Sequence, residues 1–148
     1  MEDNLKLRGD VFIVVKDKDG NIKEERKEEN LVVSAGLNFI CDRMEGTTEA
    51  VMSHMALGSG TTAAAAGDTD LESILGSREA LDSTTVSGAT VTYVSSFEAG
   101  DATGAVTEAG IFNASTAGTM LCRVVFATIN KAADDTMSVT WVITLSAS

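Results

Sequence analysis

The stretch Met137-Ser138-Val139-Thr140-Trp141-Val142-Ile143-Thr144-Leu145 alternates large apolar side chains with smaller, mostly polar ones. Successive side chains of a β-strand point to opposite sides, so the odd-numbered residues share one face. The stretch therefore predicts a strand with an apolar inner face and a more polar outer face. A single aromatic among alternating aliphatic residues usually packs inside, and we expect Trp141 in the core.

Similar β-prone segments precede this strand from residue 77 onward and are separated by turns that contain Gly. We expect strands at about 78–86, 89–97, 105–113 and 120–129. Ser87-Gly88 has the composition of a hairpin turn between the first two of them. Pro is absent and Ala, Val, Gly, Thr and Ser are abundant, which fits strands joined by Gly-, Asn- and Asp-based turns.

Residues 6–16 predict another strand, and the apolar residues 11–15 indicate burial on both faces near its middle. Asp17-Lys18-Asp19-Gly20-Asn21 then suits a tight turn, because Gly and Asn tolerate left-handed backbone angles. A second strand should follow at about 22–33. Its charged portion, 23–29, is typical of a solvent-facing strand or of an edge strand protected by charge.

The clearest helical pattern begins at Ser34, whose hydroxyl can cap a helix. Its apolar residues are spaced i, i+3, i+4 and i+7, namely Leu37, Ile40, Cys41 and Met44. Asp68 is the expected cap of a second, shorter helix that carries Leu71, Ile74 and Leu75. Between the two helices, residues 51–57 predict a strand. The four alanines at 63–66 suit either a frayed helical turn or a packed loop.

Seven or so strands with one or two short helices predict a mostly β fold, an antiparallel β-sandwich or a jelly-roll-like barrel. A chain of 148 residues falls within the size of one domain and can bury a substantial core. Within this single domain, 1–148, we distinguish a charged N-terminal hairpin at about 6–33 and a β-rich body at about 51–148.

The net charge of −11 disfavours nucleic acid as a partner, because affinity for phosphates depends mainly on Lys and Arg. Eight of the eleven basic residues lie at or before Arg43, so the rest of the chain is an acidic body. No apolar stretch approaches the length of a membrane span, and residues 1–4 are polar and acidic, unlike a signal peptide. We therefore expect a soluble protein with no membrane partner.

The sequence offers no positive case for an enzyme. His54 is the only histidine, so a catalytic triad or a multi-His metal site would have to be built around it. No nucleophile elbow accompanies it, and a structural or interface role is the favoured interpretation. Cys41 and Cys122 have apolar neighbours and no metal-binding spacing, which predicts two buried free thiols. A disulfide between them is the less favoured alternative.

No cofactor or metal ion is expected either. The turn at 17–21 has alternating carboxylates but lacks the twelve-residue spacing and closing Glu of a calcium loop. Gly58-Ser59-Gly60-Thr61-Thr62 has no following Gly-Lys-Ser/Thr and is not expected to hold phosphate. We interpret Gly58 and Gly60 as residues whose backbone angles let a strand leave its sheet. Ala63 to Ala66 can pack closely against a neighbour.

Glu108 is the residue of the body that most needs an explanation. It stands beside Ala109-Gly110 in an otherwise apolar strand, where a carboxylate should be paired or lie at an edge. Arg78 and Arg123 are the candidate partners.

Several segments in a fixed order resemble a family of small tailed-bacteriophage virion proteins, which includes head-decoration and tail-fibre proteins. The segments are 30–37 (NLVVSAGL), 54–62 (HMALGSGTT), 107–113 (TEAGIFN), 118–126 (GTMLCRVVF) and the closing Thr/Val/Trp strand. The resemblance covers about residue 30 to the C-terminus. It implies a non-enzymatic virion protein, made in the bacterial host cytoplasm, that forms homo-oligomers and contacts other virion proteins. The candidate interface residues are His54, Gly58, Gly60, Thr61, Thr62 and Glu108.

Within this class we favour a head-decoration (cement) subunit, because the chain shows no heptad or stalk repeat typical of a fibre shaft. The alternative is a tail-associated or tail-fibre protein, including a receptor- or glycan-binding module. Tyr93 and Trp141 both fall within strand patterns, whereas sugar-binding aromatics usually lie on exposed loops. A hydrolase is the third and weakest hypothesis because the chain has only one histidine.

Overall fold

The computed structural model describes residues 4–46 and 48–147, which form nine strands and one helix. In chain order they are β1 (Leu5–Lys16), β2 (Ile22–Val32), α1 (Ser34–Glu45), β3 (His54–Gly58), β4 (Glu79–Ala80), β5 (Ser83–Ser87), β6 (Thr90–Phe97), β7 (Gly104–Phe112), β8 (Met120–Lys131) and β9 (Thr136–Ala147). Among the described residues, no helix is long and apolar enough to cross a membrane.

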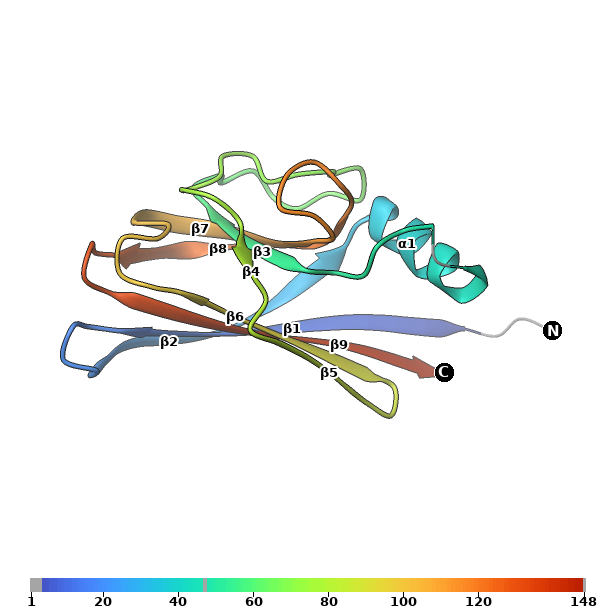
Figure 1. Cartoon of the computed structure of the whole chain (residues 1–148), viewed down its shortest axis with the longest axis horizontal. Helices are drawn as coiled ribbons and strands as arrows, with labels where there is room; N and C mark the ends of the chain where they lie inside the picture. The colour runs from blue at the N-terminus through green and yellow to red at the C-terminus, as the bar shows by residue number, and fades with distance from the viewer. Residues whose placement is uncertain (1–3, 47, 148) are drawn as a thin grey trace.

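All strands pair antiparallel in one curled sheet with the order β4-β3-β7-β8-β2-β1-β9-β6-β5. The curl brings β3, β7 and β8 over β1, β9, β6 and β5, so that two layers face each other (Figure 1). The predicted fold class, mostly β with a sandwich-like or barrel-like arrangement, is confirmed.

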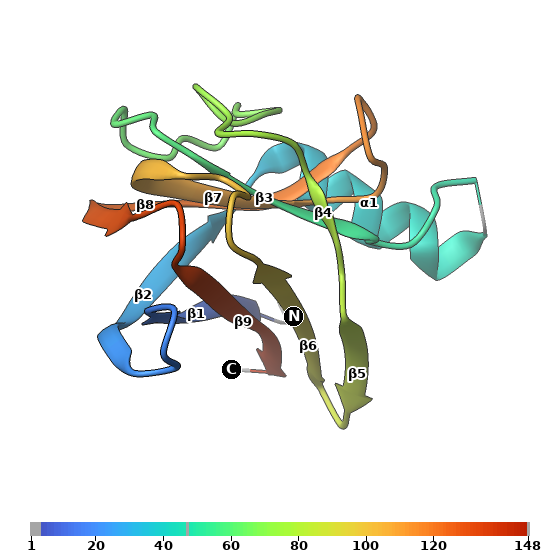
Figure 2. The same ribbon diagram turned by 60° about the vertical axis from the view of Figure 1, so that its left-hand side comes forward.

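Two strand segments connect the layers. β2 pairs with β1 from Ile22 to Asn30 and then with β8 at Leu31 and Val32. On the other side, β4 pairs with β3 and β5 pairs with β6. β4 leads directly into β5 (Figure 2), and only two residues separate the two strands. There the Leu81 N–H donates to Ser53 on the β3 side and the Asp82 N–H donates to Val94 of β6. The single strand expected at 78–86 is therefore broken where the chain changes layers.

The core lies between the layers and combines residues from both ends of the chain. Met137, Val139, Trp141 and Ile143 of β9 are buried in it, as their alternation predicts. Val11, Ile13 and Val15 of β1 belong to the same cluster. The N-terminal hairpin thus contributes to the core of the body.

The expectation that β1 is buried on both faces is wrong. Phe12 is 40% exposed on the outer face, where the ammonium of Lys27 lies 5.5 Å from the centre of its ring. The opposite layer covers the inner side of β1 only, and Val11, Ile13 and Val15 point to that side. β1 is therefore a one-sided strand with apolar residues on both faces.

Helix α1 forms where expected but buries a different face. Its buried residues are Gly36 and Phe39, whereas Leu37, Cys41 and Met44 are exposed. A Cβ atom on Gly36 would lie 2.0 Å from the carbonyl oxygen of Leu121, so the helix approaches β8 along its glycine side. Val33, not Ser34, occupies the N-cap position, and no side chain caps the helix.

Both cysteines are free, as predicted, but only Cys122 is buried. Burial raises the pKa of the Cys122 thiol well above its usual value. Cys41 is exposed because α1 turns its glycine side, not its predicted apolar side, towards the sheet.

The second helix, expected after Asp68, does not form. Residues 68–75 run as an extended loop over the outer face of the β3-β7-β8 layer, and Ile74 makes a bridge with Gly58. The N–H groups of Glu72 and Ser73 donate to the carboxylate of Glu108. A helical turn would need those donors for its own carbonyls, so the tertiary contact overrides the local pattern.

Candidate functional site

The candidate site is the loop 59–78 and the strand surface beneath it. The loop covers the outer face of the β3-β7-β8 layer, which carries a small second core of Val33, Ala56, Phe112 and Met120. Glu108 lies on this face of β7, opposite Gly58 of β3, and is 0% exposed. Five of the six candidate interface residues converge here.

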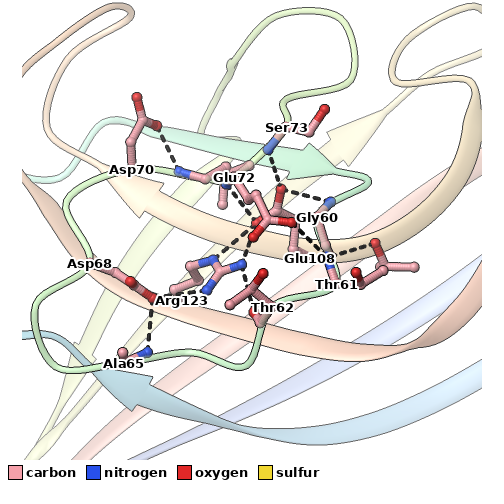
Figure 3. A network of polar contacts seen from close by, with 12 residues as sticks. Gly60, Thr61, Thr62, Ala65, Asp68, Asp70, Glu72, Ser73, Glu108 and Arg123 are labelled. Atoms are coloured by element: carbon pink, nitrogen blue, oxygen red, sulfur yellow. Dashed lines mark hydrogen bonds and ion pairs between the residues drawn. The ribbon is translucent and has the colours of Figure 1, made fainter.

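The carboxylate of Glu108 is the centre of the polar network in Figure 3. Its Oε1 accepts hydrogen bonds from the N–H of Gly60 (3.0 Å) and the N–H of Ser73 (2.8 Å). Its Oε2 accepts from the N–H of Glu72 (3.0 Å) and from Nε of Arg123 (2.9 Å). One buried side chain thereby satisfies backbone donors from both ends of the loop, 48 and 35 residues away along the chain.

Arg123 of β8 completes the network. Its Nη2 lies 2.9 Å from Oε2 of Glu108 and donates to the carbonyl of Thr62 at 3.0 Å, and its Nη1 donates to Asp68 at 2.8 Å. The predicted partnership between Glu108 and Arg123 is confirmed. A buried charge is tolerated only when it is paired and hydrogen-bonded, and both conditions are met here.

The charges of the network stabilise one another. Burial opposes the charge of Arg123, but hydrogen bonds to Glu108 and Asp68 outweigh it and raise the pKa of the guanidinium. The N–H of Ala65 and the guanidinium of Arg123 lower the pKa of Asp68, although partial burial acts in the opposite direction. Hydrogen bonds from Thr62 and Thr61 lower the pKa of Glu72. These groups are therefore ionised at neutral pH.

Gly58 and Gly60 are required by space and not by backbone angle. Neither has a positive φ, so the interpretation based on unusual backbone angles is wrong. A Cβ atom on Gly58 would lie 2.5 Å from both Oε1 of Glu108 and the carbonyl oxygen of Ser73. A Cβ atom on Gly60 would lie 2.5 Å from Cβ of Glu72. The two glycines allow the loop to approach the carboxylate.

The base of the loop is also held from the strand side. The hydroxyl of Thr107 donates to the carbonyl of Gly60 at 2.7 Å, and the N–H of Thr61 donates to Glu72 at 3.2 Å. In the portion 61–66 of the loop, most side chains nevertheless face solvent, namely Thr61, Thr62, Ala63, Ala65 and Ala66. Ala63 to Ala66 form no helix. The result is an exposed surface of small side chains on a fixed backbone.

His54 does not belong to this network. It starts β3 opposite Phe112, four residues before Gly58, and its Nδ1 lies 2.8 Å from the Ser53 hydroxyl. Arg78, the other partner considered for Glu108, lies at this end. Its guanidinium stacks 3.6 Å above the ring of Phe112 and donates to the carbonyls of Ala114 (2.8 Å) and Ala117 (2.7 Å).

Sequence reasoning missed the roles of Asp68, Glu72 and Ser73, which it assigned to a helix. The available signal was indirect. Arg123 stands in an apolar strand with Glu108 as a candidate partner, and a guanidinium has more hydrogen-bond donors than one carboxylate can accept. A second acidic partner from a distant segment was therefore to be expected. Nothing local identified Asp68 as that partner.

Apart from the loop 59–78, a hollow lies between α1 and the inner faces of β6 and β9. Its volume is about 280 Å³. It is lined by Phe39, Ile40, Arg43, Met44, Val91, Tyr93, Leu121, Ile143 and Leu145. Tyr93 is mostly buried there, and burial raises its pKa to about 12. Arg43 is the one charged residue of this lining, and it donates to the carbonyl of Glu49 at 3.0 Å.

Within the described ranges, no group of three His, Cys, Asp or Glu side chains is placed to hold a metal ion. Comparison with known proteins found no matching family model, no matching curated protein and no matching solved structure.

Proposed function

We propose that the chain is a non-enzymatic structural protein of a tailed-bacteriophage particle, and within that class a head-decoration subunit. It assembles by repeated contacts with other virion proteins, and the exposed surface of the loop 59–78 is one of its contact surfaces. The resemblance described above suggests the class of particle. The loop 59–78, which Glu108 and Arg123 hold in place, supports the proposal that the chain works by protein–protein contacts.

The observation that carries the proposal is the buried clamp of Glu108 and Arg123 beneath a loop of small exposed side chains. A loop that is ordered before binding loses less conformational entropy when it docks. Ala and Thr side chains also have little rotamer freedom to lose. The clamp thus supplies a rigid surface suited to a contact repeated many times in one particle.

The test is the location of the protein in intact particles. Particles from a lysate of the source culture are labelled with gold-conjugated antibodies raised against the purified chain and imaged by electron microscopy. Regular labelling of the head is expected. Labelling confined to the tail would replace decoration with the tail-associated alternative, and unlabelled particles that also lack the chain by mass spectrometry would overturn the virion assignment.

The contribution of the loop is tested separately. Ala63→Arg places a long charged side chain on the exposed loop, whereas Ser138→Arg places it on the exposed outer side of β9 as a matched control. Purified variants are added to particles stripped of the native protein, and rebound protein is quantified after sedimentation. We expect Ala63→Arg to rebind at least tenfold more weakly than Ser138→Arg. Equal rebinding would exclude the loop as a contact surface.

A further inference from the structure

The lower layer of the sandwich has two free strand edges of opposite character. Along β2, residues Lys23 to Glu29 are all charged and pair with β1 alone. At the other edge, β5 reads Ser-Thr-Thr-Val-Ser, and all five residues are exposed. β5 carries no charge and no Pro, and its register with β6 contains no bulge. Charged residues, Pro and bulges are the features that usually keep an edge strand from pairing with another chain, and β5 has none of them.

Hydrogen bonds show which groups of β5 point outward. The N–H of Leu145 in β9 donates to the carbonyl of Ala89, which places the odd-numbered residues of β6 on its β9 side. The even-numbered residues of β6 therefore bond to β5, and their partners there are Ser83, Thr85 and Ser87. Thr84 and Val86 direct their N–H and C=O groups away from the sheet. No backbone partner for them occurs in the described part of the chain.

Val86 also ends an apolar row in solvent. It pairs with Val91 of β6, which pairs with Ile143 of β9, so the three side chains share the inner face of the layer. Ile143 is buried, whereas Val86 is 70% exposed. Another strand added beside β5 would cover Val86.

We propose that β5 pairs antiparallel with β5 of a second copy of this chain, about a two-fold axis at Thr85. In this register Thr84 lies opposite Val86 of the second copy, and both use their outward backbone groups. Each copy carries a net charge of −11, so close approach is favoured where the local sequence is neutral. Asp82 lies opposite Gly88 of the second copy, which keeps like charges apart.

The β5 contact is argued from the strand edge itself, and only its role in a virus particle rests on the proposed function. Five residues at one edge bury less than the ~1,000 Å² of a stable protein interface, so the isolated pair is weak. A weak contact of this kind becomes effective when other contacts hold neighbouring copies side by side, since linked contacts raise the effective concentration. This is the situation in a repeated assembly.

Cysteine cross-linking tests the register. Thr85→Cys in a Cys41→Ser background removes the exposed native thiol and places one cysteine on the axis. Opposed residues of a non-hydrogen-bonded antiparallel pair have Cα atoms ~4.5 Å apart, within disulfide range. We expect at least tenfold more disulfide-linked dimer on mild oxidation than with Glu25→Cys in the same background, which places the thiol at the charged edge. Equal yields would overturn the proposal.

Analytical ultracentrifugation tests the contact without cross-linking. We expect the wild-type chain to dimerise reversibly at concentrations up to ~1 mM, and Val86→Lys to dimerise at least tenfold more weakly with unchanged circular dichroism. A wild-type chain that is monomeric throughout, or a Val86→Lys variant that dimerises equally, would overturn the β5 contact. If the chain is monomeric but is found on phage heads, the β5 contact is wrong and the proposed function stands. If the chain forms a β5-linked dimer but is absent from particles, the β5 contact stands and the proposed function is wrong.

Discussion

The molecule uses ion pairs in two regions, with different consequences. At Glu108 and Arg123, both side chains are buried and every charged oxygen has hydrogen-bond donors. Along β2, Arg26 pairs with Glu24 and Glu28, and all three side chains are partly exposed. The chemical groups are the same in both places. The buried pair holds the backbone of a distant loop, whereas the exposed pairs lie on the surface of an edge strand.

The comparison shows that burial decides what an ion pair can do. Exposed pairs contribute little to stability because water and salt screen them. Their use on β2 is to keep an edge strand from pairing with other chains. The buried pair has no such screening, so removing one partner leaves an uncompensated charge and unsatisfied backbone donors. The five predictions below test this contrast, from the largest expected effect to the smallest.

Glu108→Ala should destabilise the fold by about 3–5 kcal/mol, because it leaves Arg123 buried without its main partner and frees three backbone N–H groups. Urea unfolding followed by circular dichroism measures the change. Glu28→Ala, on β2, is the matched control and should cost less than about 1 kcal/mol. Equal losses in the two variants would contradict the contrast.

A double variant separates the ion pair from the loop contacts. Replacing a buried pair with apolar residues of similar size is often neutral. Glu108→Met with Arg123→Met should nevertheless remain destabilised, because the N–H groups of Gly60, Glu72 and Ser73 still lack their acceptor. Faster proteolysis within the loop, relative to wild type, is the expected accompanying sign. Wild-type stability in the double variant would mean that the carboxylate does not hold the loop.

Gly60→Ala should cost about 1–3 kcal/mol, because the added Cβ would lie 2.5 Å from Cβ of Glu72 and force the loop away from Glu108. Gly67→Ala is the control in the same loop, since a Cβ there meets nothing within 4 Å and its φ is not positive. Its effect should stay within about 0.5 kcal/mol. Thermal and urea unfolding of both variants make the comparison.

Acidification should weaken the clamp. Asp68 and Glu72 have lower pKa values in the folded chain than the ordinary values of 3.8 and 4.5. Their stabilising contribution is therefore complete above those ordinary values and is lost as the pH falls through the folded-state values. The stability difference between wild type and Asp68→Asn, measured in urea, should shrink from pH 7 to pH 2. A difference independent of pH would exclude the charge of Asp68 as its source.

Arg26→Ala should have the smallest effect, less than about 1 kcal/mol, because its partners are solvent-accessible. The loss should diminish further in 1 M NaCl, where surface charges are screened. Arg123→Ala, measured in the same buffers, should cost several times more and depend less on salt. A loss at Arg26 as large as that at Arg123 would show that exposure does not distinguish the two regions.

The amino-acid sequence alone determined the features that depend on neighbouring residues. The alternation from Met137 to Leu145 predicted which side chains of β9 are buried, because a strand has a fixed period of two. Ser87-Gly88 predicted the hairpin between β5 and β6, and Gly88 takes the positive φ, 57°, that Gly tolerates in such a turn. The isolated carboxylate of Glu108 indicated that a basic partner must lie nearby, because a buried charge cannot remain unpaired.

Tertiary structure alone decided the features that depend on distant residues. Residues 68–75 have a helical pattern, yet their backbone donors bond to Glu108, 35 or more residues away. α1 buries Gly36 and Phe39 because β8 lies against that side, although the helical apolar pattern pointed to Leu37, Cys41 and Met44, which are exposed. The break between β4 and β5 exists because the chain changes layers there. Local periodicity carries no information about such contacts, so the clamp and the free edge of β5 became visible only in the folded chain.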